Sequence, residues 1–138
     1  MTTPPIQNIA VIGLGTIGHS VAQVYAAAGC TVRCFDPDPT TGASLADRVR
    51  TNLKQMASAG LSSPDEIEHV VSRFVICDSE VEAVSGAEFV SEAAAEDLTI
   101  KQALFARLEN HIDRDTILAS NTSTYPMTQI SRDMVHPD

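Results

Sequence analysis

Gly13, Gly15 and Gly18 form the pattern G-x-G-x-x-G, a spacing that can hold a phosphate group. Such a turn brings free backbone N–H groups and the positive end of a helix dipole to one point. The first glycine permits the tight turn and the second lets the backbone approach a pyrophosphate. The third lets the helix pack closely on the strand. Alone, the motif is weak evidence, and a glycine-rich turn without a ligand is the alternative.

Asp36, 18 residues after Gly18, makes the motif more specific. It closes the next predicted strand, where an acid can accept hydrogen bonds from the hydroxyl groups of an adenine ribose. It would also repel a 2′-phosphate, and the following Pro37-Asp38-Pro39 offers no arginine to hold one. The pattern therefore favours NAD over NADP. The cofactor contacts predicted in this part of the chain are Gly13, Leu14, Gly15, Thr16, Ile17, Gly18 and Asp36.

Strands and helices alternate along the chain, which is typical of a parallel sheet with crossover helices. Strands are predicted at 6–12, 31–35, 74–77, 88–93 and 116–120. Helices are predicted from the glycine turn to Ala28, over 40–59 with Thr40 or Thr41 as cap, over 64–72 with Ser63 as cap, from a cap at Ser79 to Gly86, over 98–111 and over 126–130. In the first helix, the apolar residues at helical spacing are Ile17, Val21, Val24, Tyr25 and Ala28.

These elements predict an α/β fold, a doubly wound parallel sheet of the Rossmann type. Right-handed crossovers give the strand order 3-2-1-4-5, with a helical insertion after strand two. The usual dinucleotide-binding fold has a sixth strand, and the chain stops where that strand would start. We therefore expect residues 1–138 to be an incomplete NAD-binding domain, the N-terminal part of a longer protein.

The composition excludes several classes of function. The net charge of −9 argues against a nucleic-acid partner, which needs a basic face. No apolar run is long enough to span a membrane. Three cysteines without a C-x-x-C pair predict reduced thiols, no metal site and a cytoplasmic protein. Among the four histidines, His19 is interpreted as a helix-surface residue, and His136 is rejected as a catalytic base.

The second half of the chain resembles the 3-hydroxyacyl-CoA dehydrogenase family. Residues 90–101, VSEAAAEDLTIK, are similar to the family segment V-x-E-A-x-x-E-x-x-x-x-K. Residues 119–123, ASNTS, match the family's A-S-N-T-S at the end of strand five. Together with the glycine turn, the resemblance covers essentially the whole chain. It implies reversible hydride transfer between C3 of an L-3-hydroxyacyl-CoA and C4 of the nicotinamide of NAD.

The same resemblance assigns roles to residues in the second half. Glu96 and Lys101 would lie near the nicotinamide half of the cofactor, and Ala93 is a further predicted cofactor contact. Ser123 would touch both the nicotinamide and the 3-oxygen of the substrate, and Asn121 would support that site. The family's general base, in an H-F-x-N-P strand, lies beyond this chain, so we expect NAD binding without turnover. From the residues alone, Ser123 could be a helix cap, Glu96 a first-turn acid and Lys101 part of a solvated face.

Other functions remain open at this point. The stretch after strand two has Arg48, Arg50, Lys54 and Arg73 but no lysine cluster for CoA phosphates, so dehydrogenases of free 3-hydroxy acids, of the carnitine or gulonate type, also fit. A non-catalytic NAD-binding module fits as well. A short-chain-type dehydrogenase expects a Y-x-x-x-K pair, which is absent, and a 6-phosphogluconate type would prefer NADP. In the family, a C-terminal helical domain makes a homodimer, which we expect of the full-length protein, with a small-molecule substrate as its other partner.

Overall fold

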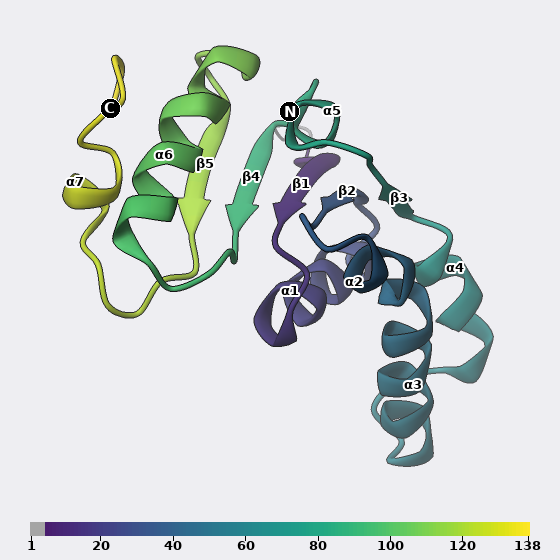
Figure 1. Cartoon of the computed structure of the whole chain (residues 1–138). Helices are drawn as coiled ribbons and strands as arrows, with labels where there is room; N and C mark the ends of the chain where they lie inside the picture. The colour runs from purple at the N-terminus through teal and green to yellow at the C-terminus, as the bar shows by residue number, and fades with distance from the viewer. Residues whose placement is uncertain (1–4) are drawn as a thin grey trace.

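A computed structural model describes residues 5–138 and contains a five-stranded parallel sheet (Figure 1). The strands are β1 (Asn8–Ile12), β2 (Thr31–Phe35), β3 (Phe74–Ile76), β4 (Phe89–Glu92) and β5 (Ile117–Ser120). Their order in the sheet is β3-β2-β1-β4-β5, and all neighbours are parallel. The predicted fold class and strand order are confirmed. Each crossover from one strand to the next contains at least one helix.

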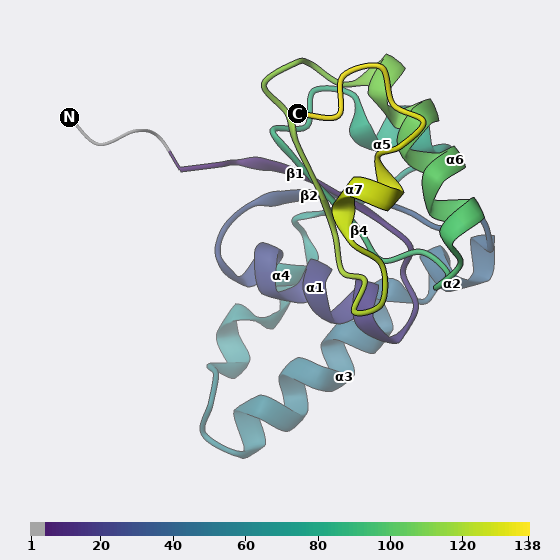
Figure 2. The same cartoon turned by 90° about the vertical axis from the view of Figure 1, so that its left-hand side faces the viewer.

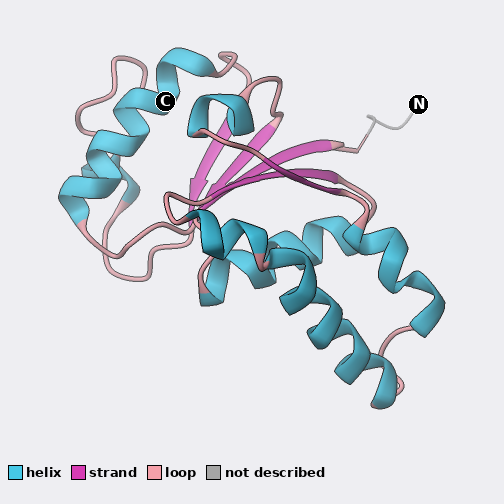
Figure 3. Cartoon of the chain, turned by 45° about the vertical axis from the view of Figure 1, so that its right-hand side comes forward, coloured by secondary structure: helices cyan, strands magenta, loops and turns pink. Residues whose placement is uncertain are grey.

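Helices cover both faces of the sheet (Figure 3). They are α1 (Thr16–Ala27), α2 (Pro39–Ala43), α3 (Leu45–Ser58), α4 (Ile67–Val71), α5 (Glu80–Val84), α6 (Leu98–Leu108) and α7 (Met127–Ile130), with 3-10 turns η1 (Pro64–Glu66) and η2 (Glu109–His111). Successive residues of β1 point to opposite faces. Ile9 and Val11 belong to a buried cluster with residues of α1, α3 and α4, whereas Ala10 and Ile12 belong to a second cluster with residues of α5 and α6. This two-sided burial explains why the central strands are apolar throughout.

Four strands are shorter than predicted. β1 begins at Asn8 rather than at residue 6, because the backbone N–H groups of Gln7 and Asn8 donate to a carboxylate oxygen of Glu88 instead of joining the ladder. At the other ends, Cys77 and Ala93 each donate one further backbone bond to the neighbouring strand and then turn away.

The buried face of α1 differs from the predicted one. The buried residues are Gly18, Ala22 and Ala26, whereas Ile17 and Val24 are exposed. Of the predicted residues, Tyr25 is partly buried and packs against the core. A Cβ on Gly18 would lie 1.8 Å from the carbonyl oxygen of Gly13. The small residues therefore let α1 approach the sheet closely, while Ile17 and Val24 face outward.

The insertion between β2 and β3 is built from more pieces than predicted. The single helix expected over 40–59 is divided at Ser44 into α2 and α3. Its cap is Asp38, not Thr40 or Thr41. The Asp38 side chain accepts from the hydroxyl of Thr40 and from its N–H, and these bonds lower the pKa of that carboxyl group. The predicted caps Ser63 and Ser79 both accept a backbone N–H. Helices α3 and α4 project away from the sheet (Figure 1).

Three further results concern the expected chemistry of the chain. All three cysteines are free, and burial raises the pKa of the Cys34 thiol to about 12. Within residues 5–138, no group of three His, Cys, Asp or Glu side chains is placed to hold a metal ion. Over the same residues, no helix is both long and apolar enough to cross a membrane.

Candidate functional site

The candidate site lies where the strands end, at the switch point between β1 and β4. The arrowheads of β1, β4 and β5 point to the same end of the sheet in Figure 1. Backbone bonds hold the segments that follow the strands side by side: Gly13 donates to Phe35 (2.9 Å), Ala93 to Ile12 (2.8 Å) and Asn121 to Glu92 (2.8 Å). In open α/β sheets the ligand binds at this edge. The predicted site segments therefore converge on one place.

The three glycines of the turn do not have the same surroundings. Gly13 has a φ of +92°, and a Cβ there would lie 2.6 Å from the carbonyl oxygen of Ala93. Gly18 packs against Gly13 itself. A Cβ on Gly15, in contrast, would meet nothing within 4 Å. Gly13 and Gly18 are thus required by the protein's own packing, whereas Gly15 keeps a space open that the protein does not fill.

Asp36 lies directly beside the glycine turn. One carboxylate oxygen accepts from the N–H of Leu14 (2.8 Å), and the other accepts from the N–H of Asp38 (2.9 Å). The side chain is half-buried, so it can still be reached by a ligand. Because the acid is bonded to the turn, the predicted ribose-binding and pyrophosphate-binding groups form one unit.

The loops after β4 and β5 are tied to each other. Asn121 donates its side-chain amide to the hydroxyl of Ser91 (2.8 Å) and to the carbonyl of Glu92 (3.1 Å). The hydroxyl of Thr122 donates to the Glu96 carboxylate at 2.6 Å. Ser123 is exposed on the same loop. The structure thus places Asn121, Ser123 and Glu96 on two adjoining loops.

Two of the alternative interpretations of these loops are wrong. Helix α7 has Pro126 as its N-cap, without a side-chain bond, so Ser123 does not cap it. Glu96 lies before Asp97, the cap of α6, and the first turn of that helix contains no acid.

Lys101 is not on a solvated face, which corrects the third alternative. Its side chain is buried, and its ammonium group lies 2.7 and 2.9 Å from the two carboxylate oxygens of Glu92. Glu96 is farther away, at 3.9 Å. Sequence reasoning missed Glu92. The available signal was an acid at the end of a predicted central strand, where it would be buried, because a buried charge needs a partner.

The insertion reaches the glycine turn through two side chains that were also missed or misread. Arg48 on α3 donates to the carbonyl oxygens of Leu14 (2.8 Å) and Thr41 (2.9 Å). His19 is half-buried rather than a simple surface residue: its Nδ1 lies 2.8 Å from the carbonyl oxygen of Gly15. Its Nε2 lies 3.2 Å from the Asn52 amide on α3. Helix α3 runs beside α1 (Figure 2), so these contacts connect the insertion to the turn.

Replacing Arg48 by alanine is expected to lower the free energy of unfolding by about 1–3 kcal/mol, because the carbonyl oxygens of the buried Leu14 and the half-buried Thr41 lose a charged donor. Arg50, on the same helix, is the control. It pairs with the exposed acids Asp47 and Glu68, so Arg50→Ala should cost much less. Urea unfolding of both variants measures the difference. Equal losses would mean that the Arg48 contacts do not stabilise the turn.

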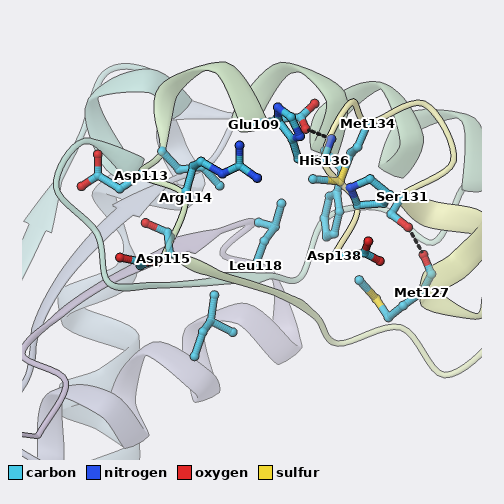
Figure 4. A pocket seen from close by; sticks show the side chains of 15 residues that line it. Glu109, Asp113, Arg114, Asp115, Leu118, Met127, Ser131, Met134, His136 and Asp138 are labelled. Atoms are coloured by element: carbon cyan, nitrogen blue, oxygen red, sulfur yellow. Dashed lines mark hydrogen bonds between the residues drawn. The ribbon is translucent and has the colours of Figure 1, made fainter. Parts of the chain in front are cut away.

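A groove lies elsewhere, beside the free edge of β5 (Figure 4). It has a volume of about 440 Å³ and is lined by Phe105, Leu118, Met127 and Met134 among others. None of the predicted site residues lines it.

Comparison with known proteins identifies relatives that match almost the whole chain. The family model described as "3-hydroxyacyl-CoA dehydrogenase, NAD binding domain" matches residues 8–138. The probable 3-hydroxybutyryl-CoA dehydrogenase of Bacillus subtilis is 35% identical over 126 residues, which cover 91% of this chain and 44% of that protein. An L-carnitine dehydrogenase of Streptomyces coelicolor is 32% identical and covers 99% of this chain and 42% of its own length.

A solved structure is similar over the same region. The crystal structure of 3-hydroxybutyryl-CoA dehydrogenase from Escherichia coli superimposes with a TM-score of 0.89 at 30% identity. The match covers 97% of this chain and 28% of that one. The chain thus spans less than half the length of these relatives.

Proposed function

Because the chain belongs to the 3-hydroxyacyl-CoA dehydrogenase family through its NAD-binding domain, we propose that it provides the cofactor half of an enzyme that oxidises an L-3-hydroxyacyl-CoA to the 3-ketoacyl-CoA. The observation that carries the proposal is the open space at Gly15, between two glycines that the fold requires for its own packing. At Gly15 the backbone has no side chain and no protein atom lies close to it. A pyrophosphate can therefore approach the backbone at the N-terminus of α1.

The residues of the chain fit NAD from one end to the other. Asp36 would accept from the adenosine ribose, and the turn from Gly13 to Gly18 would hold the pyrophosphate. Ala93, Glu96 and Lys101 would border the nicotinamide half. Bound NAD supplies the redox chemistry, as the acceptor or donor of hydride. The protein's share is to bind and orient it.

Ser123 is the residue proposed to act on the substrate. Its hydroxyl is exposed on the loop after β5, where it can donate to the 3-oxygen of a bound substrate. Asn121 would keep that loop in place through its bonds to Ser91 and Glu92. The general base, the substrate-covering helical domain and the homodimer contact are proposed for a longer protein of which this domain is part.

The experiment that tests the cofactor assignment is a calorimetric titration with NADH and, separately, with NADPH. We expect NADH to bind more tightly, because Asp36 repels a 2′-phosphate. Asp36→Ala should remove that preference by weakening NADH and no longer penalising NADPH. Asp38→Ala is the matched control. Asp38 carries the same charge and lies two residues after Asp36, but it serves as the cap of helix α2.

Binding of neither cofactor by the wild-type chain would contradict the proposal for this domain. An unchanged NADH preference in Asp36→Ala would contradict the role of that residue. A loss of preference in Asp38→Ala as well would mean that general charge, and not the position of Asp36, selects the cofactor.

A free 3-hydroxy acid is the second candidate substrate, and one observation favours it. Three of the four basic residues after β2 are engaged within the protein: Arg48 with Leu14, Arg50 with Asp47 and Glu68, and Arg73 with Ala26. They are therefore poorly placed to meet CoA phosphates. Rates of the full-length enzyme with acetoacetyl-CoA and with acetoacetate would decide between the two substrates.

A further inference from the structure

We propose that Glu92 is a positioning residue for the nicotinamide half of the site, an inference that rests on the proposed function. Its buried carboxylate joins three segments: the loop after β4, the end of β5 and helix α6. The side chain has no exposed surface, so it cannot touch a ligand. It would act by fixing the residues that do.

All the contacts of the Glu92 carboxylate are short and come from different parts of the chain. One oxygen accepts from the N–H of Ala94 (2.7 Å) and from Lys101 (2.7 Å). The other accepts from the hydroxyl of Ser120 (2.6 Å) and from Lys101 (2.9 Å). Four donated bonds thus converge on one side chain. Both oxygens are satisfied, so the carboxylate has little freedom to move.

The partners of Glu92 lead directly into the predicted site. Ser120 immediately precedes the loop that carries Asn121 and Ser123. The Lys101 ammonium also reaches the carbonyl oxygen of Ala94 at 3.4 Å and the Glu96 carboxylate at 3.9 Å. Glu96 in turn accepts from Thr122. These contacts form a closed ring that joins the end of β4, helix α6 and the loop after β5. Its members are Glu92, Lys101, Glu96, Thr122 and Ser120.

This ring lies on only one side of the glycine turn. Asp36 follows β2, the turn follows β1, and the ring joins β4 and β5 on the far side of β1. A dinucleotide whose pyrophosphate lies at the turn and whose adenosine lies at Asp36 must place its other half over β4 and β5. The adenosine side has its own fixing contacts, from Leu14 and Asp38 to Asp36. The two halves can therefore be perturbed separately.

A purely stabilising role would be better served by apolar side chains. Burying an ion pair costs desolvation energy, and replacing such a pair by hydrophobic residues is often neutral or stabilising. Carboxylate and ammonium groups, however, form directional hydrogen bonds, whereas a methyl group forms none. A fully bonded charge pair at the junction of two site loops is thus suited to setting their positions.

The test compares the binding of NADH with that of ADP-ribose, which lacks the nicotinamide. In Glu92→Gln/Lys101→Met, which removes both charges together, we expect a near-native melting temperature. NADH should bind roughly ten-fold more weakly, the effect of losing about one charge-assisted hydrogen bond. ADP-ribose should bind within two-fold of wild type. The emission of bound NADH should also shift toward that of free NADH.

Ser120→Ala provides a second, milder variant that removes one donor to Glu92. It should lower the NADH affinity several-fold and leave ADP-ribose unchanged. Thr116→Val is its matched control, because Thr116 donates to the carbonyl of Ala87 at the opposite end of β5. It should alter stability without changing the ratio of the two affinities.

Each outcome decides the proposal. An unchanged NADH-to-ADP-ribose ratio in Ser120→Ala and in a folded double variant would overturn the positioning role, as would an equal loss of both ligands. If the double variant does not fold, the Ser120→Ala ratio decides. Failure of the wild-type chain to bind either ligand would instead contradict the proposed function, so the two failures are distinguishable.

Discussion

Gly15→Ala is expected to weaken NADH binding roughly 30-fold or more while leaving the fold intact. The added methyl group would occupy the space where the backbone approaches the pyrophosphate. The loss corresponds to about 2 kcal/mol, the scale of one hydrogen bond to a charged group. Nothing within 4 Å opposes the methyl group, and the φ of −69° suits alanine. The free energy of unfolding should therefore change by less than about 1 kcal/mol.

Gly18→Ala is the control for this result, because it adds the same methyl group three residues later. There the Cβ would lie 1.8 Å from the carbonyl oxygen of Gly13, so α1 would have to move. We expect a loss of about 1–3 kcal/mol in stability. Urea unfolding and calorimetric titration of both variants measure the two effects. Wild-type affinity in Gly15→Ala would show that the pyrophosphate does not lie at this turn.

Lys101→Met should destabilise the protein by about 3–5 kcal/mol, the largest stability loss that we expect from a single substitution here. It leaves the Glu92 carboxylate buried without a counter-charge, which is far more costly than removing the whole pair. Glu92→Gln/Lys101→Met should therefore recover most of the stability that the single variant loses. Equilibrium unfolding in urea provides the free energies.

Arg107 is the comparison on the same helix. It pairs with Glu80 at 2.7 Å, but its side chain is 55% exposed. Arg107→Met should thus cost less than about 1 kcal/mol. If Lys101→Met lowered the free energy of unfolding no more than Arg107→Met does, water or another group would have to compensate the charge of Glu92. The interpretation of Glu92 and Lys101 as a buried ion pair without access to water would then be wrong.

The sequence predicted those features that depend on neighbours along the chain. The glycine turn, the acid at Asp36 and the caps Ser63 and Ser79 all follow from local rules. The strand order followed from the handedness of the crossovers. The predicted cap of the second helix was wrong because both Thr40 and Asp38 have side chains that can cap a helix. In the structure Asp38 is the cap, and the hydroxyl of Thr40 donates to its carboxylate.

Features that depend on distant contacts could not be predicted. The face of α1 was misjudged because apolar periodicity weighs hydrophobic side chains, whereas close packing on the sheet selects small ones such as Ala22 and Ala26. Arg48 meets Leu14 across 34 positions of the chain. Glu92 and Lys101 are only nine residues apart, but a strand end and a helix have to fold back on each other before they meet.

The central position of β1 also affects the order of assembly. Its start is fixed to Glu88, 80 residues away from Asn8, so the crevice forms only after a long segment of chain has been closed. Such non-local pairing is slow, and we expect it to be a late step of folding. A cofactor that binds across this junction recognises only the finished fold. At a concentration of 100 Kd it would add about 2.7 kcal/mol to native stability by mass action.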